Sequence, residues 1–272
     1  MIPQTPGSKQ SARSSVYWVM RLRVLVVVTL STSVLVGSQT ARLNTADAVL
    51  ERYKEALGGV DAIKNVQSET TRGEIEGTGL KGKATFVNYS KPFKSLFKVT
   101  LPDGGEIDSG FDGTVSWTIT PQGASIDKDT PLESVRRDAD LQYALHQPDY
   151  FKKLEFAGMT DFEDHRCYWL HGTTHWGKDN NQFYDVETGL LVGYRYQADA
   201  GSPLVNTAVF SDYKSYGRRL TPTKLVNRSG DRMRTLTITS FTYEPLSGLS
   251  LRITSGRQSA AEIDLQIGRT LA

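Results

Sequence analysis

The sequence predicts a mainly β protein, a curled antiparallel sheet or half-open β-barrel with helices covering its concave face. From Ser68 onward, short runs of β-branched and aromatic residues alternate with Gly, Pro, Asn and Asp, a pattern typical of antiparallel strands. Several connections, such as Thr78-Gly79 and Asp112-Gly113, are too short to hold crossover helices. This excludes a doubly wound parallel sheet, and only a few stretches have helical spacing.

About twelve strands follow from this pattern. The predicted strands are 70–77, 81–89, 95–101, 106–111, 114–120, 154–159, 167–176, 182–185, 190–197, 206–213, 220–227 and 234–243. The string Gly77-Thr-Gly-Leu-Lys-Gly82 matches a dinucleotide-binding fingerprint only by its letters, because it joins two strand patterns instead of opening a helix. We interpret it as a hairpin turn.

Two regions have helical character. Residues 44–57 carry apolar residues at helical spacing, with Asn44 or Thr45 able to cap the start and Gly58-Gly59 the end, and 60–66 predicts one or two further turns. Residues 131–145 do not form one apolar face, which predicts two short helices or a kink, ended by Pro148.

A sheet of this size must curl, because open twisted sheets rarely exceed about ten strands. The helices would then cover its concave face, and we expect an apolar cavity between the two layers. The alternative is a solidly packed core. Strand alternation predicts the lining residues Phe97, Val99, Val115, Trp117, Ile119, Tyr168, Leu170, Tyr194 and Tyr196.

The N-terminal region predicts export. Arg21 and Arg23 precede an apolar run of 13 residues, Val24 to Val36, and small residues follow to Ser38. Such a run is shorter than the roughly 20 residues that span a bilayer core, and it fits a secretory signal whose translation starts at Met20. We therefore expect a signal segment at 1–38, one domain at 39–246, and a tail or extra strand at 247–272.

Charge and cysteine content narrow the functional classes. Of the 32 basic residues, four precede Gln39, where no acidic residue lies, so the remainder has 28 basic and 30 acidic side chains. This near-neutral balance disfavours nucleic acid as a partner. Cys167 is the sole cysteine, which excludes an internal disulfide and a cysteine-built zinc site.

No catalytic or metal-binding motif stands out, and we predict no cofactor, no metal and no catalytic residue. His171 and His175 would share a strand face about 13 Å apart, too far for one ion on a straight strand. Cys167 beside His165 is better explained by strand packing than by nucleophilic catalysis.

Several short segments, taken in their order along the chain, resemble the LolA/LolB-like family of bacterial periplasmic proteins, including its outer-membrane lipoprotein-sorting group. They are Tyr53-Lys-Glu-Ala-Leu-Gly-Gly59, Thr71-Arg-Gly73, Gly79-Leu-Lys-Gly82, Lys91-Pro92, Gly110-Phe-Asp-Gly113, Val115-Ser-Trp117 and Phe183-Tyr-Asp-Val-Glu-Thr-Gly-Leu-Leu191. The resemblance implies a half-open barrel that holds acyl chains, and hence a periplasmic carrier of lipid or lipoprotein.

Two other readings stay open. The protein could be a structural or interaction subunit of an envelope assembly that pairs with a protein partner through exposed strand edges. It could also be an enzyme with catalytic groups dispersed over the strands, for which His171, His175 and Asp185 are the first residues to consider.

Overall fold

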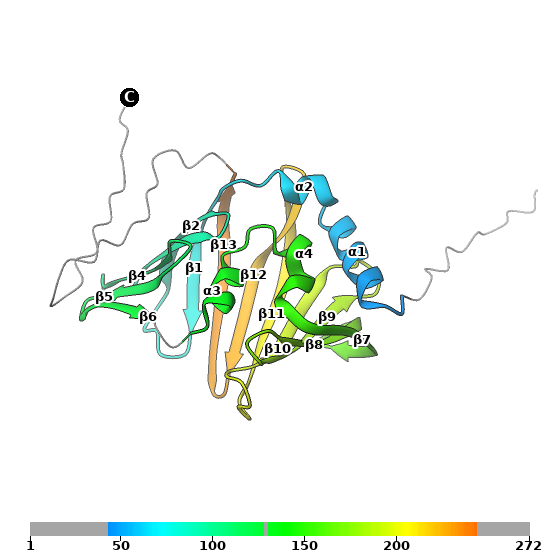
Figure 1. The fold of residues 1–272 in the computed structure, drawn as a ribbon. Helices are drawn as coiled ribbons and strands as arrows, with labels where there is room; N and C mark the ends of the chain where they lie inside the picture. The colour runs from blue at the N-terminus through cyan, green and yellow to red at the C-terminus, as the bar shows by residue number, and fades with distance from the viewer. Residues whose placement is uncertain (1–42, 128–129, 244–272) are drawn as a thin grey trace, which may run out of the picture. The chain divides into compact units, whose positions relative to one another are not determined.

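The computed structural model describes residues 43–127 and 130–243, which form one antiparallel sheet of 13 strands with a few short helices (Figure 1). This confirms the predicted fold class, a curled sheet with covering helices. The strands are β1 (Glu69–Gly77), β2 (Ala84–Lys91), β3 (Lys94–Thr100), β4 (Glu106–Phe111), β5 (Ser116–Thr120), β6 (Gly123–Asp127), β7 (Phe151–Phe162), β8 (His165–Thr174), β9 (Asp179–Asp185), β10 (Leu191–Gln197), β11 (Val205–Tyr216), β12 (Arg219–Ser229) and β13 (Arg232–Thr242).

The sheet consists of two meanders that meet at β1 and β13. Its order is β6-β5-β4-β3-β2-β1-β13-β12-β11-β10-β9-β8-β7. The junction pairs Thr70 with Thr242 at one end and Gly77 with Arg234 at the other, with a register shift after Arg72. Consequently β6 and β7, which are consecutive in the chain, form the opposite edges of the sheet.

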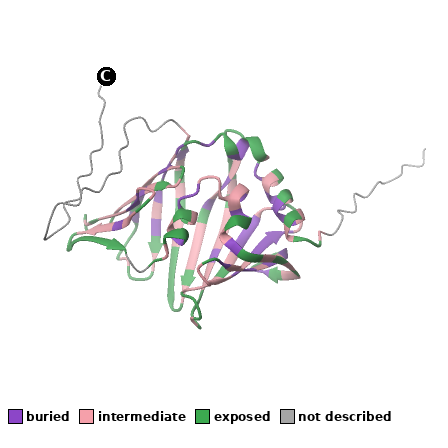
Figure 2. Cartoon of the chain, in the orientation of Figure 1, coloured by how far each residue is buried: buried purple, intermediate pink, exposed green. Residues whose placement is uncertain are grey.

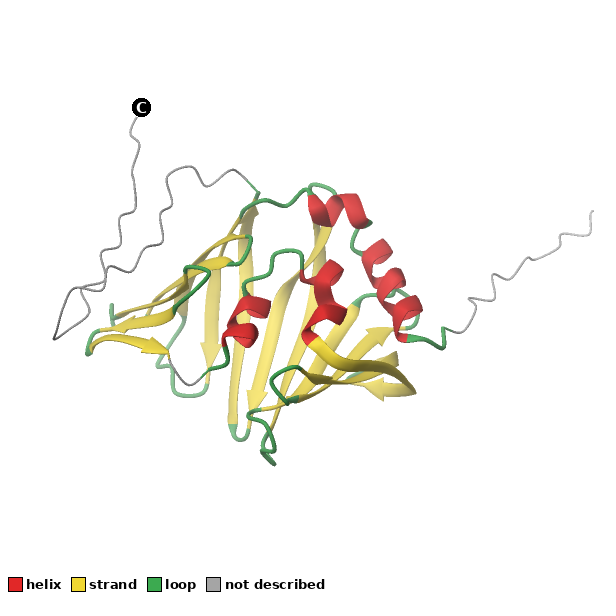
Figure 3. Ribbon diagram, viewed as in Figure 1, coloured by secondary structure: helices red, strands yellow, loops and turns green. Residues whose placement is uncertain are grey.

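The chain between β6 and β7 must cross the sheet, and it does so over the concave face (Figure 3). It contains α3 (Leu132–Asp138), α4 (Tyr143–His146) and the 3₁₀ helix η1 (Gln147–Tyr150). The helices α1 (Ala46–Ala56) and α2 (Val60–Lys64) precede β1 and cover the same face beside α4. The prediction of two short helices between the halves of the sheet is confirmed.

Helix α1 begins and ends as its sequence predicts. The Thr45 hydroxyl accepts a hydrogen bond from the Ala48 backbone N–H at 3.2 Å, which caps the first turn. At the other end Gly58 has a φ of 110°, and a Cβ there would lie 2.1 Å from the Arg218 carbonyl oxygen. Only glycine allows the α1–α2 turn to approach the β11–β12 turn this closely.

The buried residues form separate clusters, and Figure 2 shows buried positions on the strands and on the covering helices. The largest joins α1, α2 and α4 to β8, β9 and β10 through Val49, Leu50, Tyr53, Leu57, Ile63, Ala144, Tyr168, Leu170, Tyr184 and Leu191. A second cluster of Phe162, Cys167, Phe183 and Val192 lies on the opposite face, because strand neighbours such as Cys167 and Tyr168 alternate between faces.

Three local predictions were wrong. Strand β6 was missed, because all five of its residues are exposed and its alternation of apolar and polar side chains covers only residues 124–127. Val115 lies outside β5, in a turn where its N–H donates to Asp112 Oδ1 at 2.8 Å. Pro148 does not end the helical region; it stands in the first turn of η1, where its missing N–H costs nothing.

The other predictions made from the sequence either agree with the structure or concern residues outside the described part. The segment Gly77–Gly82 is the turn of the β1–β2 hairpin, as predicted. Strand β7 begins at Phe151, three residues before the predicted start. The predicted signal segment 1–38 and tail 247–272 fall outside the described residues. Within 43–127 and 130–243, no helix is both long and apolar enough to cross a membrane.

Replacing Gly110 by alanine should destabilise the fold by about 1–3 kcal/mol, the usual cost of overpacking a core. Gly110 is paired with Trp117, and an added Cβ would lie 2.3 Å from the Trp117 indole, whose side chain is buried. Urea unfolding of Gly110→Ala and of the control Gly105→Ala, which meets no contact under 3.0 Å, measures the difference. Equal stabilities would contradict the packing described for Trp117.

Candidate functional site: a cavity under the helices

A cavity of about 380 Å³ lies between the sheet and the helices α1 and α4. Its walls are mostly aromatic and aliphatic side chains from both meanders. The lining residues are Tyr53, Glu69, Thr71, Phe86, Asn88, Phe97, Tyr143, Leu191, Tyr194, Phe210, Tyr213, Arg219, Thr221, Pro222, Lys224, Leu225, Leu236, Ile238 and Phe241. We call this the main cavity.

A second hollow of about 410 Å³ adjoins the main cavity and shares Tyr143, Tyr194 and Leu225 with it. Its remaining walls are polar, formed by Arg137, Asp138, Asp140, Asn180, Tyr196 and Asn227. The interior under the helices is therefore mainly apolar along β13 and polar beneath α3, while β1 contributes the polar residues Glu69 and Thr71.

Tyrosine rings hold the wall between the helices and the sheet. The Tyr53 ring of α1 meets the Tyr184 ring edge-on at 5.2 Å between centroids, and Tyr194 lies 5.3 Å from Phe210. Burial raises the pKa of Tyr53 to about 12, against the opposing charge of Arg219, and burial also raises the pKa of Tyr143 and Tyr194. These phenols stay neutral at physiological pH, so the wall they form is uncharged.

Two charged side chains, Arg219 and Glu69, lie close enough to affect each other in the main cavity. Arg219, the first residue of β12, donates from Nη1 to the Leu141 carbonyl at 3.3 Å, and its Nε is buried with no partner among the described residues. Burial raises the pKa of the Glu69 carboxyl, and the Arg219 charge opposes that rise. Lys224 is a further cation of the lining, five residues along β12 from Arg219.

The sheet is split beside these charges. Pairs between β12 and β13 run only from Lys224–Thr237 to Ser229–Arg232, although β11 stays paired with β12 as far as Arg219 and β1 with β13 as far as Thr242. Pro222 lies in the half of β12 that is paired with β11 but not with β13, and a proline has no backbone N–H to donate to a neighbouring strand. The main cavity is lined from both sides of this split, by Pro222 and by Phe241.

The structure brings together only some of the residues predicted to line a cavity. Phe97 and Tyr194 line the main cavity, and Tyr194 and Tyr196 line the polar hollow. The others lie outside these two linings. Val99 packs beside Phe86, and Tyr168 and Leu170 are buried in the cluster under α1. Trp117 packs against Gly110, Ile119 of β5 is paired with Asp108 of β4, and Val115 is in a turn.

Sequence reasoning missed the charged residues of the cavity. Arg219 follows the Gly217-Arg218 turn, and Glu69 is the first residue of a strand, so both lie at strand ends, where polar residues are expected anyway. Leu225 and Leu236 could have been found, because they are directly paired across β12 and β13. The sequence predicts 220–227 and 234–243 as consecutive strands, and consecutive strands of a meander pair with each other.

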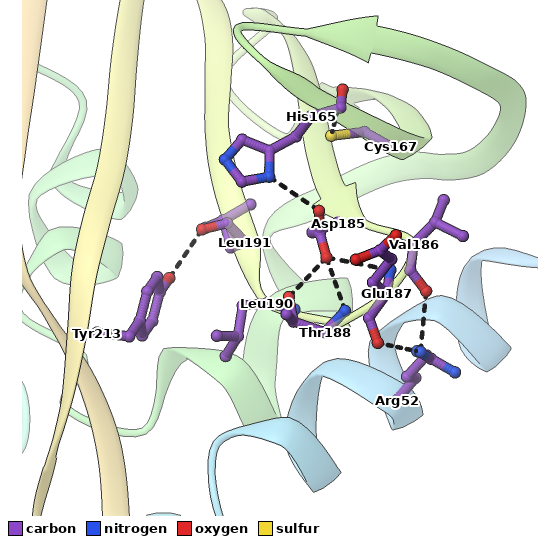
Figure 4. A network of polar contacts seen from close by, with 10 residues as sticks. All are labelled: Arg52, His165, Cys167, Asp185, Val186, Glu187, Thr188, Leu190, Leu191 and Tyr213. Carbon is purple, nitrogen blue, oxygen red and sulfur yellow. Dashed lines mark hydrogen bonds and ion pairs between the residues drawn. The ribbon is translucent and has the colours of Figure 1, made fainter.

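The histidines and Asp185 serve turns and strand pairs. His165 Nδ1 lies 2.9 Å from Asp185 Oδ2, while Asp185 Oδ1 accepts hydrogen bonds from the Thr188 N–H at 2.6 Å and the Thr188 hydroxyl at 2.8 Å (Figure 4). His171 Nδ1 lies 3.2 Å from Asn181 Oδ1. Among the described residues, no three His, Cys, Asp or Glu side chains are grouped to hold a metal ion.

The turn that Asp185 shapes is also the anchor of α1. Arg52 of α1 donates from Nη2 to the carbonyls of Val186 at 2.9 Å and Glu187 at 2.8 Å (Figure 4). Beside it, Cys167 is buried, and burial raises the pKa of its thiol to about 12. A thiol held protonated in this way is a poor nucleophile.

Solved structures show which fold this is. No sequence-family model matches the chain, and no curated protein matches it. A LolA superfamily protein from Nitrosomonas europaea is similar over 75% of this chain and 96% of its own, at 12% identity and a TM-score of 0.52. A putative outer membrane lipoprotein-sorting protein domain from Vibrio parahaemolyticus is similar over 75% and 94%, at 11% identity and a TM-score of 0.53.

A DUF1329 family protein from Desulfovibrio piger is similar to the same degree, over 75% of this chain and 94% of its own, at 16% identity and a TM-score of 0.51. At sequence identities this low, the similarity shows the fold and nothing more. The chain has the LolA-like fold, which confirms the resemblance found in the sequence.

Replacing Asp185 by asparagine should destabilise the protein at pH 7 by about 1–3 kcal/mol, because a charged acceptor of several hydrogen bonds is lost. Burial by itself would raise the pKa of Asp185, but the hydrogen bonds from Thr188 and His165 outweigh it and lower that pKa. A lowered pKa gives stability that is present above the unfolded value of about 3.9 and is lost as the pH falls through the folded value.

The difference between wild type and Asp185→Asn should therefore shrink below about pH 4. Thermal unfolding from pH 7 to pH 2.5 measures it, with the exposed neighbour Asp164→Asn as the matched control. A difference that stays constant with pH would show that Asp185 does not act through its charge.

Proposed function

We propose that this protein is an exported, periplasmic binding protein that holds the acyl chains of lipids or lipoproteins in its main cavity. The observation that carries the proposal is the cavity of about 380 Å³, lined mainly by apolar side chains. Ligand sites of small molecules commonly measure about 300–1,000 Å³. Each methylene group that enters such a site contributes about 0.8 kcal/mol of transfer free energy.

The LolA-like fold supports the proposal, since one solved structure of this fold is described as a putative outer membrane lipoprotein-sorting protein domain. Export is supported by the basic and apolar pattern of residues 21–38. An acyl chain would enter beside the helices or through the split between β12 and β13, where the wall has no complete backbone ladder.

Binding is favoured over catalysis by the chemistry of the wall. The lining of the main cavity holds neither histidine nor cysteine, and its tyrosines are kept neutral by burial. The dispersed residues His171 and Asp185 are engaged with Asn181 and with a turn. None of these groups is arranged as a nucleophile with a general base.

A second function, pairing with an envelope protein, is favoured by one edge of the sheet. Strand β6 is exposed at all five residues, and within 43–127 and 130–243 its strand partner is β5 alone. Its outward backbone groups could accept a partner strand. Capture of the same envelope protein by wild type, and its loss in a variant lacking residues 123–127, would support this function.

Partly filling the cavity should weaken acyl binding. Leu225 lines both the main cavity and the polar hollow, and Leu225→Trp would occupy the space that a chain needs. We expect the variant to bind a fluorescent C16 fatty acid about tenfold more weakly than wild type, by loss of about two buried methylenes. Titration of the delipidated mature protein measures this.

Leu204→Trp is the matched control, because Leu204 is 43% exposed and lies outside both linings. It should bind as wild type does. The proposal fails if wild type takes up no probe and its organic extract contains no fatty acid or phospholipid, or if both variants bind equally well. Retained cooperative thermal unfolding of Leu225→Trp shows that the variant is folded.

A further inference from the structure

The charged part of the main cavity has no assigned ligand. We propose that the cavity takes an amphiphile with an anionic head, a carboxylate or a phosphate, and that Arg219 pairs with that head. The inference rests on the proposed function, and it specifies which class of acyl compound the cavity selects.

The backbone next to Arg219 is fixed by a hydrogen bond, and its guanidinium group has N–H donors that are not used within the described residues. The Leu220 N–H donates to the Leu57 carbonyl at 3.0 Å, which fixes the start of β12 against the end of α1. Of the five guanidinium donors, one is directed to the Leu141 carbonyl, and Nε is buried without a partner among the described residues. A planar fork of this kind matches a carboxylate or a phosphate in two-pronged geometry.

The polar residues lead directly to an apolar wall. Arg219, Thr221 and Leu225 line the same cavity from one strand, and the rise of that strand puts Leu225 about 20 Å from Arg219. Opposite Leu225 lies Leu236, and the wall continues sideways across β13 and β1 through Ile238 to the Phe86 and Phe97 rings, which lie 5.3 Å apart. An anionic head bound at Arg219 would therefore have an apolar wall beside it for its hydrocarbon chain.

Glu69 does not neutralise the arginine. No hydrogen bond or ion pair joins the two side chains in the part of the chain that the structure describes, although the Arg219 charge acts on Glu69. Lys224 lies five residues further along β12, about 16 Å away by strand rise, so it does not add to the charge around Arg219. An anionic head would thus pair with Arg219, and Glu69 opposes its binding when ionised.

The test compares ligands that share one chain and differ in the head. Palmitate, 1-palmitoyl lysophosphatidate and neutral monopalmitoylglycerol are titrated by isothermal calorimetry into wild type and Arg219→Met. Arg219→Met removes the cation that pairs with the anionic head, so the variant should bind the tighter of the two anionic ligands about tenfold or more weakly than wild type. Monopalmitoylglycerol should change by less than about twofold. Palmitate binding more tightly than lysophosphatidate identifies a carboxylate site, and the reverse order a phosphate site.

Two further variants sharpen the result. Arg218→Met is the matched control, since Arg218 is exposed and outside the lining of the main cavity, and it should bind all three ligands as wild type does. Glu69→Gln removes the opposing carboxyl and should tighten the anionic ligands without affecting the neutral one.

Equal weakening of all three ligands by Arg219→Met would overturn the inference, because it would assign a structural role to the side chain. Unchanged binding of the anionic ligands would overturn it as well. If wild type binds the neutral and anionic ligands alike, only this inference fails. If it binds none of them, the proposed acyl-binding function fails too.

Discussion

The connection between β6 and β7 is the constraint on which the rest of the structure depends. These consecutive strands form opposite edges of one sheet of 13 strands, so the chain between them has to cross a face of the sheet. It crosses the concave one and carries α3, α4 and η1 over it. The cover therefore follows from the strand order, and the space under the cover exists because short helices cannot fill a curled sheet completely.

Buried hydrogen bonds hold the covering segment η1 against β9 of the sheet. Gln147, at the start of η1, donates through Nε2 to the Tyr184 hydroxyl at 2.7 Å and to the side-chain Oε1 of Gln182. The Tyr184 ring also packs against Tyr53 of α1, so one residue of β9 holds both covering segments. Buried hydrogen bonds of this kind favour one arrangement over others, although Gln147 Oε1 itself has no partner among the described residues. The tyrosines line the space without charging it.

Local patterns predicted the helices, most strands and the LolA-like fold, because capping, turns and alternation are properties of neighbouring residues. The sequence reasoning failed where the outcome depends on distant residues. Whether Tyr168 or Tyr194 faces the cavity depends on which part of the sheet α1 covers, and that is set by the pairing of β1 with β13 across about 160 residues. Strand β6 was missed because an exposed edge strand buries nothing. Arg219 was missed because its environment is built by Leu57, Leu141 and Glu69 from three other segments.

The central claim is that an acyl chain lies on the concave face, between the sheet and its helical cover. Intermolecular nuclear Overhauser effects between ¹³C-labelled palmitate and protein methyl groups test it most directly. The account predicts contacts from the chain to Leu225, Leu236 and Ile238, which line the main cavity. Contacts to Val192 and Val209, which pack on the opposite face, or no contacts at all under saturating ligand, would contradict it.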